Sequence, residues 1–120
     1  YGDGSSRRDY TYIDDCVQGI LAALEWTMDK GDPRYDIFNL GESQTVSLLE
    51  LVSLLEKNLD IKAKRRHADY LPGDVYATFA DISHSQAVLG YRPQVKVEEG
   101  LRRFCEWYLK EEKGQPWERT

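Results

Sequence analysis

The sequence has little cysteine and no long apolar run. Among its 120 residues only Cys16 and Cys105 are cysteines, far apart and without Cys-x-x-Cys or Cys/His metal-ligand spacing. This pattern favours two reduced thiols in a cytoplasmic protein over a disulfide framework. No apolar segment approaches the ~18 residues that span a bilayer, and residues 1–8 have no signal-peptide core. We therefore expect a cytoplasmic protein without a membrane partner.

The chain also lacks an excess of positive charge. It carries 16 Lys+Arg against 21 Asp+Glu, a formal net charge of −5, which opposes binding to nucleic acid or anionic lipid. The one dense basic stretch, residues 62–67, makes a nucleic-acid binder a minor hypothesis. Tyr70 is the single aromatic residue close by, so the stretch is better interpreted as a solvated strand face. We expect no nucleic-acid partner.

Local motifs for catalysis, metal binding and cofactor binding are absent as well. His67 and His84 have no His-x-x-x-His or His-Glu spacing, and no Gly-x-Ser-x-Gly elbow is present. The pair Gly2 and Gly4 lacks the preceding strand, the third glycine and the immediate helix of a dinucleotide fingerprint. We therefore expect no catalytic residue, no metal site and no cofactor site within the chain itself.

Composition and periodicity predict one small domain. Hydrophobic residues (41%) and charged residues (31%) match ordinary globular usage. After a turn at residues 2–6, β-propensity predicts a strand over 8–13. An apolar stripe at helical spacing then predicts a helix over 14–29; its members are Val17, Ile20, Leu21 and Leu24. Residues 35–41, short, apolar and ended by glycine, are predicted to form a buried strand with parallel neighbours.

The second half of the chain continues the pattern of helices with a few short strands. Ser47 with Glu50 predicts a capping box and a helix start. Residues 61–68 are predicted to be a strand, 71–75 have a turn signature, and 97–109 form an amphipathic helix. A second possible capping box precedes a short helix that ends at Gly90; its members are Ser83 and Gln86. Three to four helices are expected in total.

Two residues far apart in sequence are the candidate binding pair. Arg8 follows the glycine-rich turn, and Asp74 closes the sequence Pro-Gly-Asp. A guanidinium can bind a diphosphate bidentately, and a carboxylate on a turn can accept hydrogen bonds from sugar hydroxyls. The residues alone leave a second interpretation open, in which Arg8 pairs with Asp14 or Asp15 and Asp74 only shapes its turn.

Five motifs, in order, carry a family resemblance over nearly the whole chain. They are GDGSSRRDYTYIDD (2–15), IFNLG (37–41), LPGDV (71–75), ADIS with LGYRP (80–83 and 89–93), and the helix at 97–109. Together they resemble the carboxyl-terminal part of NAD-dependent nucleotide-sugar epimerases and dehydratases, the extended short-chain dehydrogenases. The resemblance implies an α/β fold, mixed α+β in an isolated fragment.

Within that family the motifs look closest to the 4-epimerases acting on UDP-glucuronate or UDP-glucose. Carried over by position, Arg8 contacts the nucleotide diphosphate and Asp74 the ribose or uridine end of the substrate. Many UDP-glucose epimerases have Arg where this chain has Leu71 and Tyr where it has Thr78. That departure leans toward a uronate-type or a broader UDP-hexose enzyme.

The resemblance also implies what the chain lacks. The family removes a hydroxyl proton with the Tyr of Tyr-x-x-x-Lys while hydride passes to NAD, and neither that motif nor the NAD fingerprint occurs here. We expect residues 1–113 to be a substrate-binding region, silent alone, with 114–120 a frayed tail and the amino-terminal NAD-binding Rossmann domain absent. NAD and the UDP-sugar then belong to the complete enzyme.

In the family, part of the apolar surface of this region packs on the amino-terminal domain, so that surface should be exposed in the fragment. We therefore expect the fragment to self-associate, for example as a dimer. Two alternatives stay open. One is a stand-alone, non-catalytic binding or interaction domain of the same fold. The other is a part of another nucleotide-sugar dehydratase or decarboxylase of the family.

Overall fold

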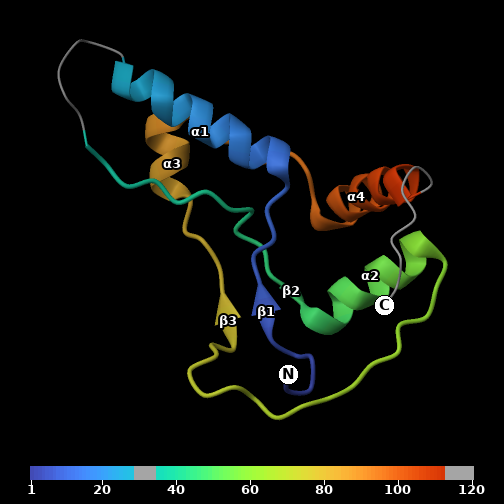
Figure 1. Ribbon diagram of the computed structural model, residues 1–120. Coiled ribbons are helices and arrows are strands. Elements are labelled where there is room, and N and C mark those ends of the chain that lie inside the picture. The colour runs from blue at the N-terminus through green and yellow to red at the C-terminus, as the bar shows by residue number, and fades with distance from the viewer. Residues whose placement is uncertain (29–34, 113–120) are drawn as a thin grey trace.

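The computed structural model describes residues 1–28 and 35–112, and in them the chain forms four helices and a small sheet (Figure 1). In chain order the elements are β1 (Arg7–Arg8), α1 (Ile13–Met28), β2 (Val46–Ser47), α2 (Leu48–Leu59), β3 (Ala77–Thr78), α3 (Ser83–Leu89) and α4 (Val97–Glu112). The expected α/β class with mixed α+β elements is confirmed. The predicted tail, 114–120, lies outside the described residues.

The sheet has the strand order β2-β1-β3, with β1 in the centre. β1 pairs with β2 antiparallel, Arg7 opposite Ser47, and with β3 in parallel, Arg8 opposite Thr78. Each strand has only two residues. The sheet therefore joins three distant parts of the chain through very short ladders.

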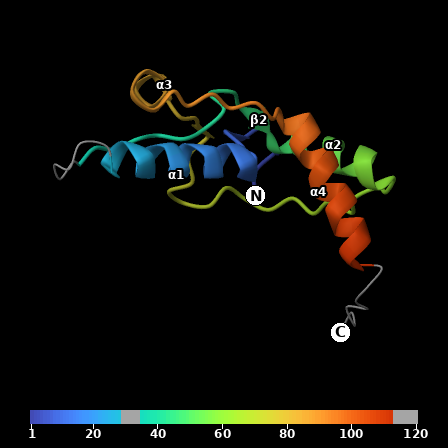
Figure 2. The same cartoon turned by 90° about the horizontal axis from the view of Figure 1, so that it is seen from above.

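The helix predicted over 14–29 is confirmed as α1, which packs by one face. Gly19 is buried on this face. A Cβ atom at this position would lie only 2.5 Å from the Leu40 side chain, so a residue with a side chain would not fit. The apolar stripe points the other way and is 44–59% exposed; it consists of Val17, Ile20, Leu21 and Leu24. The described residues therefore cover only about half of the predicted stripe. Figure 2 shows α1 extending away from the pair formed by α2 and α4.

The capping box of α2 is confirmed in both directions. The Glu50 N–H donates to Ser47 Oγ at 3.2 Å, and the Ser47 N–H donates to Glu50 Oε2 at 2.7 Å. The helix is capped by Asp60, whose N–H still donates to the Glu56 carbonyl. The left-handed φ of 52° at Asp60 then turns the Ile61 N–H to the same carbonyl, at 3.2 Å. The predicted amphipathic helix is also confirmed, as α4, which packs against α2.

The second capping box is wrong, although its helix, α3, is present. The residue before α3 is Ile82, with no capping side-chain bond. Asp81 Oδ1 instead accepts hydrogen bonds from the Ser83 N–H at 2.9 Å and the Ser83 hydroxyl at 2.6 Å. The carboxylate captures the hydroxyl that was predicted to cap the helix, because an ionised acceptor makes the stronger bond. Gly90, with a φ of 67°, ends the helix as expected.

Three predicted strands are wrong in whole or in part. The strand over 8–13 shrinks to β1, and neither 35–41 nor 61–68 is a strand. In 35–41, the Asn39 carbonyl accepts from Ser85 Oγ and the Gly41 carbonyl from the Tyr91 hydroxyl. In 61–68, backbone groups likewise bond to side chains or single backbone groups instead of a ladder. Strand propensity without a neighbouring strand does not make a ladder.

The buried core is small and extends from the residue before α3, through the link between α3 and α4, into α4. Its apolar members are Ile82, Tyr91, Val95, Val97 and Cys105. Tyr91 is completely buried, and burial raises its pKa to about 12. Cys16 and Cys105 are both free, and burial raises the pKa of the Cys105 thiol. Among the described residues no helix has the length and apolar character needed to cross a membrane.

Candidate functional site

The structure brings Arg8 and Asp74 together as an ion pair. Arg8 Nη2 lies 2.9 Å from Asp74 Oδ1, with the two side chains 31% and 38% exposed. Asp74 is placed by a tight turn, in which its N–H donates to the Leu71 carbonyl at 3.1 Å. Gly73 has a φ of 85°, which fits a type II turn with proline before it. The parallel pairing of β1 with β3 then sets this turn beside Arg8.

The Arg8 guanidinium keeps one edge open. Nη1 donates to the carbonyls of Arg7, at 2.8 Å, and Tyr76, at 3.3 Å, while Nη2 donates to Asp74. The Nε–H and the second Nη2 hydrogen have no partner among the described residues. Nε and Nη2 form the edge that binds a carboxylate or phosphate with two parallel hydrogen bonds. The Nε–H therefore remains as a donor for an anion while the ion pair with Asp74 is formed.

The alternative pairing of Arg8 with Asp14 or Asp15 is wrong. Asp15 is buried and accepts from the N–H groups of Gln94 and Val95, both at 2.9 Å. Asp14 lies in the first turn of α1, with Arg103 Nη1 of α4 3.8 Å away. Arg8 and Asp74 therefore form the site geometry that the sequence suggested, while their binding role stays a prediction.

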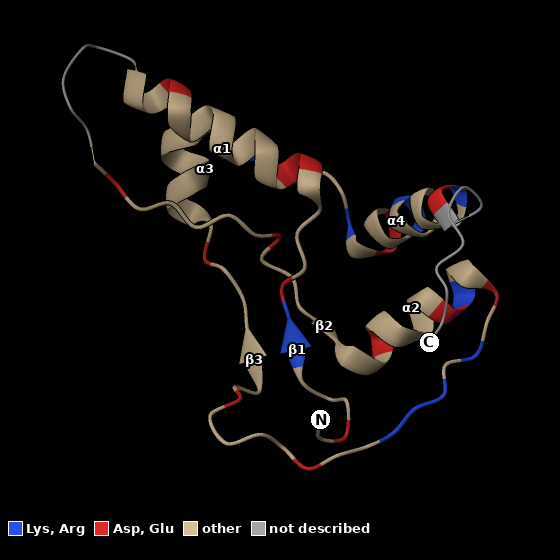
Figure 3. Cartoon of the chain, viewed as in Figure 1, with Lys and Arg blue, Asp and Glu red and all other residues tan. Residues whose placement is uncertain are grey.

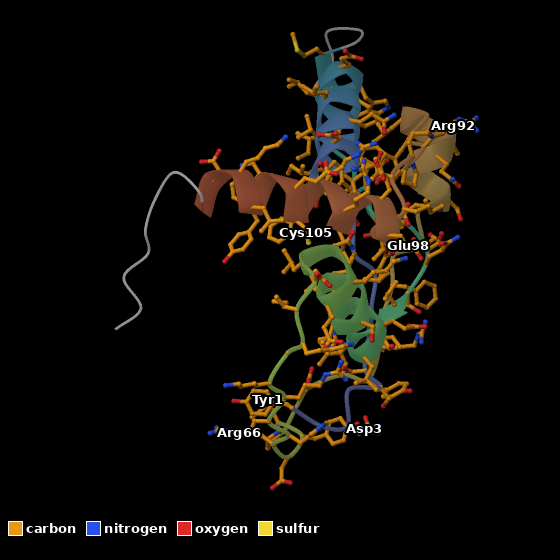
Figure 4. All side chains as sticks on the ribbon, turned by 90° about the vertical axis from the view of Figure 1, so that its right-hand side faces the viewer. Tyr1, Asp3, Arg66, Arg92, Glu98 and Cys105 are labelled. Atoms are coloured by element: carbon orange, nitrogen blue, oxygen red, sulfur yellow. The ribbon has the colours of Figure 1, made fainter. Side chains whose placement is uncertain are left out.

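The glycine-rich turn, residues 2–6, is bonded to the segment that precedes the Pro-Gly-Asp turn. Asp3 Oδ1 accepts from the Ser5 N–H and hydroxyl and from the Tyr70 hydroxyl, and these bonds, those of Ser5 foremost, lower the pKa of Asp3 to about 2. A Cβ atom on Gly2 would lie 2.4 Å from the Tyr70 ring. The turn is thus fastened to the segment that leads into the Pro-Gly-Asp turn. Figure 4 shows Asp3, Tyr1 and Arg66 at one end of the molecule, far from Arg92.

Asp9 is a functional-region residue that sequence reasoning missed. Its carboxylate accepts three backbone hydrogen bonds, from Glu42, Ser43 and Ala80. These donors lie 33 to 71 positions away along the chain. Its place immediately after Arg8 was the only available signal.

The histidines and the basic stretch take separate places. His67 Nδ1 lies 3.2 Å from the Gly2 carbonyl, and His84 Nε2 lies 2.8 Å from Asp36 Oδ2. Over the ranges 1–28 and 35–112, no cluster of three metal-ligand side chains is found. The basic stretch follows α2 as an exposed strip (Figure 3). Glu56 binds two of its cations, with Lys62 Nζ at 3.2 Å and Arg65 Nη2 at 3.1 Å.

Two hollows lie away from the pair. A groove of about 590 Å³ runs between residues 42–46, α2 and the start of α4. An apolar hollow of about 270 Å³ lies beside Tyr12, Leu51 and Phe104. Neither contains Arg8 or Asp74, so the candidate pair occupies an open surface. An open pair supplies part of a binding site and needs further walls to enclose a ligand.

Comparison with known proteins identifies the family. A family model described as GDP-mannose 4,6 dehydratase matches residues 1–104. The chain belongs to this family of NAD-dependent nucleotide-sugar epimerases and dehydratases, the extended short-chain dehydrogenases, as its motifs indicated. An uncharacterized protein of Methanocaldococcus jannaschii is 48% identical over 109 residues, which are 91% of this chain and 32% of that protein.

Other similar proteins have named activities. UDP-glucuronate 4-epimerase 5 of Arabidopsis thaliana is 44% identical, over 88% of this chain and 26% of its own length. The crystal structure of UDP-glucuronic acid 4-epimerase from Bacillus cereus, in complex with UDP-glucuronic acid and NAD, has a TM-score of 0.80 at 35% identity. It is covered over 34% of its length by 92% of this chain. The chain thus spans between 26% and 34% of the length of these relatives.

Proposed function

We propose that the chain is the substrate-binding, carboxyl-terminal part of an NAD-dependent UDP-sugar 4-epimerase of the UDP-glucuronate or UDP-glucose type. Arg8 contacts the nucleotide diphosphate, and Asp74 accepts a hydrogen bond from the ribose or uridine end. The observation that carries the proposal is the 2.9 Å ion pair that joins these two residues across 66 positions of sequence. The names and ligands of the solved neighbours support the substrate class.

The two side chains offer complementary chemistry at one place. Arg8 presents two open N–H donors for diphosphate oxygens, and Asp74 Oδ2 has no partner among the described residues. A nucleotide needs both, an anion-binding donor edge and an acceptor for ribose hydroxyls. Thr78 lies opposite Arg8 in the parallel ladder. With Thr and not a bulkier side chain here, we propose a uronate or a broader range of UDP-hexoses as substrate.

NAD belongs to the complete enzyme in this proposal, because the described residues do not fit it. The family's dinucleotide site needs a strand, a glycine-rich turn and a helix in direct succession. Here the glycine-rich turn precedes β1, and the space at Gly4 is filled by Leu49, whose Cγ would lie 2.8 Å from an added Cβ atom. We assign no step through NAD to this chain and expect the 120 residues alone to be inactive.

The exposed surface of α1 has two proposed consequences. In the longer protein, the stripe and the neighbouring segment around Ile37, 69% exposed, pack on the NAD-binding domain. In the isolated chain the same apolar surface drives self-association, such as a dimer, since contiguous apolar patches of this kind favour burial. We place the complete enzyme in the cytoplasm, and without a nucleic-acid or membrane partner.

The test uses the complete gene product, whose upstream coding sequence should contain a glycine-rich dinucleotide motif and Tyr-x-x-x-Lys. We expect it to interconvert UDP-glucuronate or UDP-glucose with the corresponding 4-epimer. Arg8→Ala should raise KM by about tenfold or more, while Arg92→Ala, an exposed arginine far from the pair, should change KM less than about twofold. Equal effects of both substitutions, or no epimerase activity with any UDP-hexose, would contradict the proposal.

A further inference from the structure

The distance between Arg8 and Asp74 depends on a very short ladder. Between β1 and β3 the Arg7 N–H donates to the Tyr76 carbonyl at 2.8 Å, and the Asp9 N–H donates to the Thr78 carbonyl at 3.2 Å. A parallel pair with strands of two residues each is marginal in water, because even isolated hairpins of greater length are barely stable. Other contacts must therefore hold β1 and β3 in register.

The Asp9 carboxylate supplies such contacts. Oδ1 accepts from the Glu42 N–H at 2.9 Å, and Oδ2 accepts from the N–H groups of Ser43 at 3.0 Å and Ala80 at 3.1 Å. Hydrogen bonds to an ionised carboxylate are about twice as strong as neutral ones. Asp9 thereby ties the end of β1 to the residues that follow β3 and to the turn before β2.

The turn at residues 41–43 is shaped to reach this carboxylate. A Cβ atom on Gly41 would lie 2.7 Å from Asp9 Oδ2 and 2.6 Å from the Ala80 Cβ. Ser43 has a φ of 54°, a left-handed conformation that aims its N–H at the same oxygen. The absence of a side chain at Gly41 and the strained turn at Ser43 both serve the close approach of three segments to one carboxylate.

Asp9 and Arg8 are neighbours in sequence, but their side chains have no bonding partner in common. The Asp9 carboxylate accepts only backbone N–H groups, whereas the Arg8 guanidinium donates to two carbonyls and to Asp74. The three backbone donors occupy both Asp9 oxygens. Because its bonds go to the backbone of distant segments, the carboxylate acts on the candidate pair through the strands that it holds.

We infer that Asp9 is a positioning residue for the candidate site, a carboxylate that locks β1 against β3 and thereby fixes Arg8 beside Asp74. The inference rests on the proposed function, in which that pair binds the nucleotide. It adds that substrate affinity depends on a side chain that never touches the substrate.

Asp9→Asn tests the inference in the complete gene product. The amide keeps the size of the side chain but turns an NH₂ group toward backbone donors, leaving at least one N–H without a partner. We expect KM for the UDP-sugar to rise about tenfold with kcat changed less than about twofold, the sign of lost uniform binding. Amide hydrogen exchange of Glu42, Ser43 and Ala80 should become faster.

Asp15→Asn is the matched control. Asp15 is likewise a carboxylate that accepts two backbone N–H groups from a distant segment, 79 and 80 positions away, but it holds the start of α1 and not the sheet. Both substitutions should lower the melting temperature. Only Asp9→Asn should raise KM, and its effect should vanish in an Arg8→Ala background because it acts through Arg8.

The outcomes separate the inference from the proposed function. An unchanged KM in Asp9→Asn, an equal rise in Asp15→Asn, or a full additional rise in the Arg8→Ala background would overturn the positioning role while leaving Arg8 as a ligand. An unchanged KM in Arg8→Ala itself would overturn the proposed function. If Asp9→Asn does not fold, Gly41→Ala displaces the same carboxylate by crowding and should raise KM in the same way.

Discussion

The link between α3 and α4 and the small sheet around β1 are stabilised differently. The link buries apolar side chains, with Tyr91 completely enclosed. The sheet has β3 exposed and is held by polar contacts, those of Asp9 and the Arg8–Asp74 pair. Burial resists change at any pH and salt concentration, whereas ion pairs and hydrogen bonds depend on both. The candidate site therefore lies in the part of the molecule whose geometry depends on polar contacts. These contacts change with pH and salt concentration.

The largest expected effect is in the buried link. Tyr91→Ala should lower the free energy of unfolding by about 3 to 5 kcal/mol, since it leaves a cavity and removes the hydrogen bond to the Gly41 carbonyl. Tyr76→Ala, at an exposed tyrosine beside the sheet, should change it by about 0.5 kcal/mol or less. Urea unfolding monitored by circular dichroism measures both. Similar losses for the two variants would contradict the comparison.

The exposed stripe on α1 should govern assembly and not stability. Leu21→Glu, at a leucine 53% exposed, should shift the isolated chain toward monomer with little change in its unfolding free energy. Gln18→Glu adds the same charge at an exposed polar position of the same helix and serves as the control. Sedimentation velocity at micromolar concentration distinguishes them. A chain that is already monomeric, or that dissociates equally in both variants, speaks against this interface.

Acid should weaken the contacts that Glu56 of α2 makes with the basic stretch, residues 62–67. The Ala63 N–H, together with Lys62 and Arg65, lowers the pKa of Glu56 from 4.5 to about 2. The stabilisation that Glu56 contributes is therefore complete above pH 4.5 and is lost as the pH falls toward 2. Glu56→Gln should remove this part of the acid sensitivity, whereas Glu111→Gln, exposed near the end of α4, should retain it. Melting temperatures between pH 5 and pH 2 give the answer, and parallel curves for both variants would refute it.

The smallest effect is expected at Glu42, where the two regions meet. Burial raises the pKa of Glu42, and the Lys96 amine 3.5 Å away only partly opposes this. A carboxyl with a raised folded pKa destabilises the native state when ionised and becomes favourable as the pH falls. Glu42→Gln should thus keep or increase stability at pH 7, by up to about 1 kcal/mol. A clear loss in thermal unfolding at pH 7 that is absent at pH 4 would mean that the ion pair with Lys96 outweighs burial.

Sequence reasoning succeeded where interactions are local. The capping box of Ser47 and Glu50 spans three residues, and the stripe on α1 repeats within one helix, so both could be predicted. The Arg8–Asp74 site could be suggested because each residue lies in a recognisable turn or strand motif.

Long-range acceptors explain what was missed. Asp9 and Asp15 resemble any other acidic residues in sequence, yet each binds backbone donors from distant segments. Residues 35–41 have the composition of a strand, but ladder formation depends on a neighbour that composition does not specify. Even the failed capping box at Ser83 depended on competition from Asp81 two residues earlier.

The spacing of the Asp9 bonds also bears on how the chain folds during synthesis. Asp9 and its donor Ala80 are separated by 71 positions, and closing so long a loop costs entropy before any contact returns free energy. While a ribosome produces this chain from its amino end, β1 has no parallel partner until β3 has emerged. The Arg8–Asp74 geometry is therefore expected to form late, after α1 and α2 have become helical.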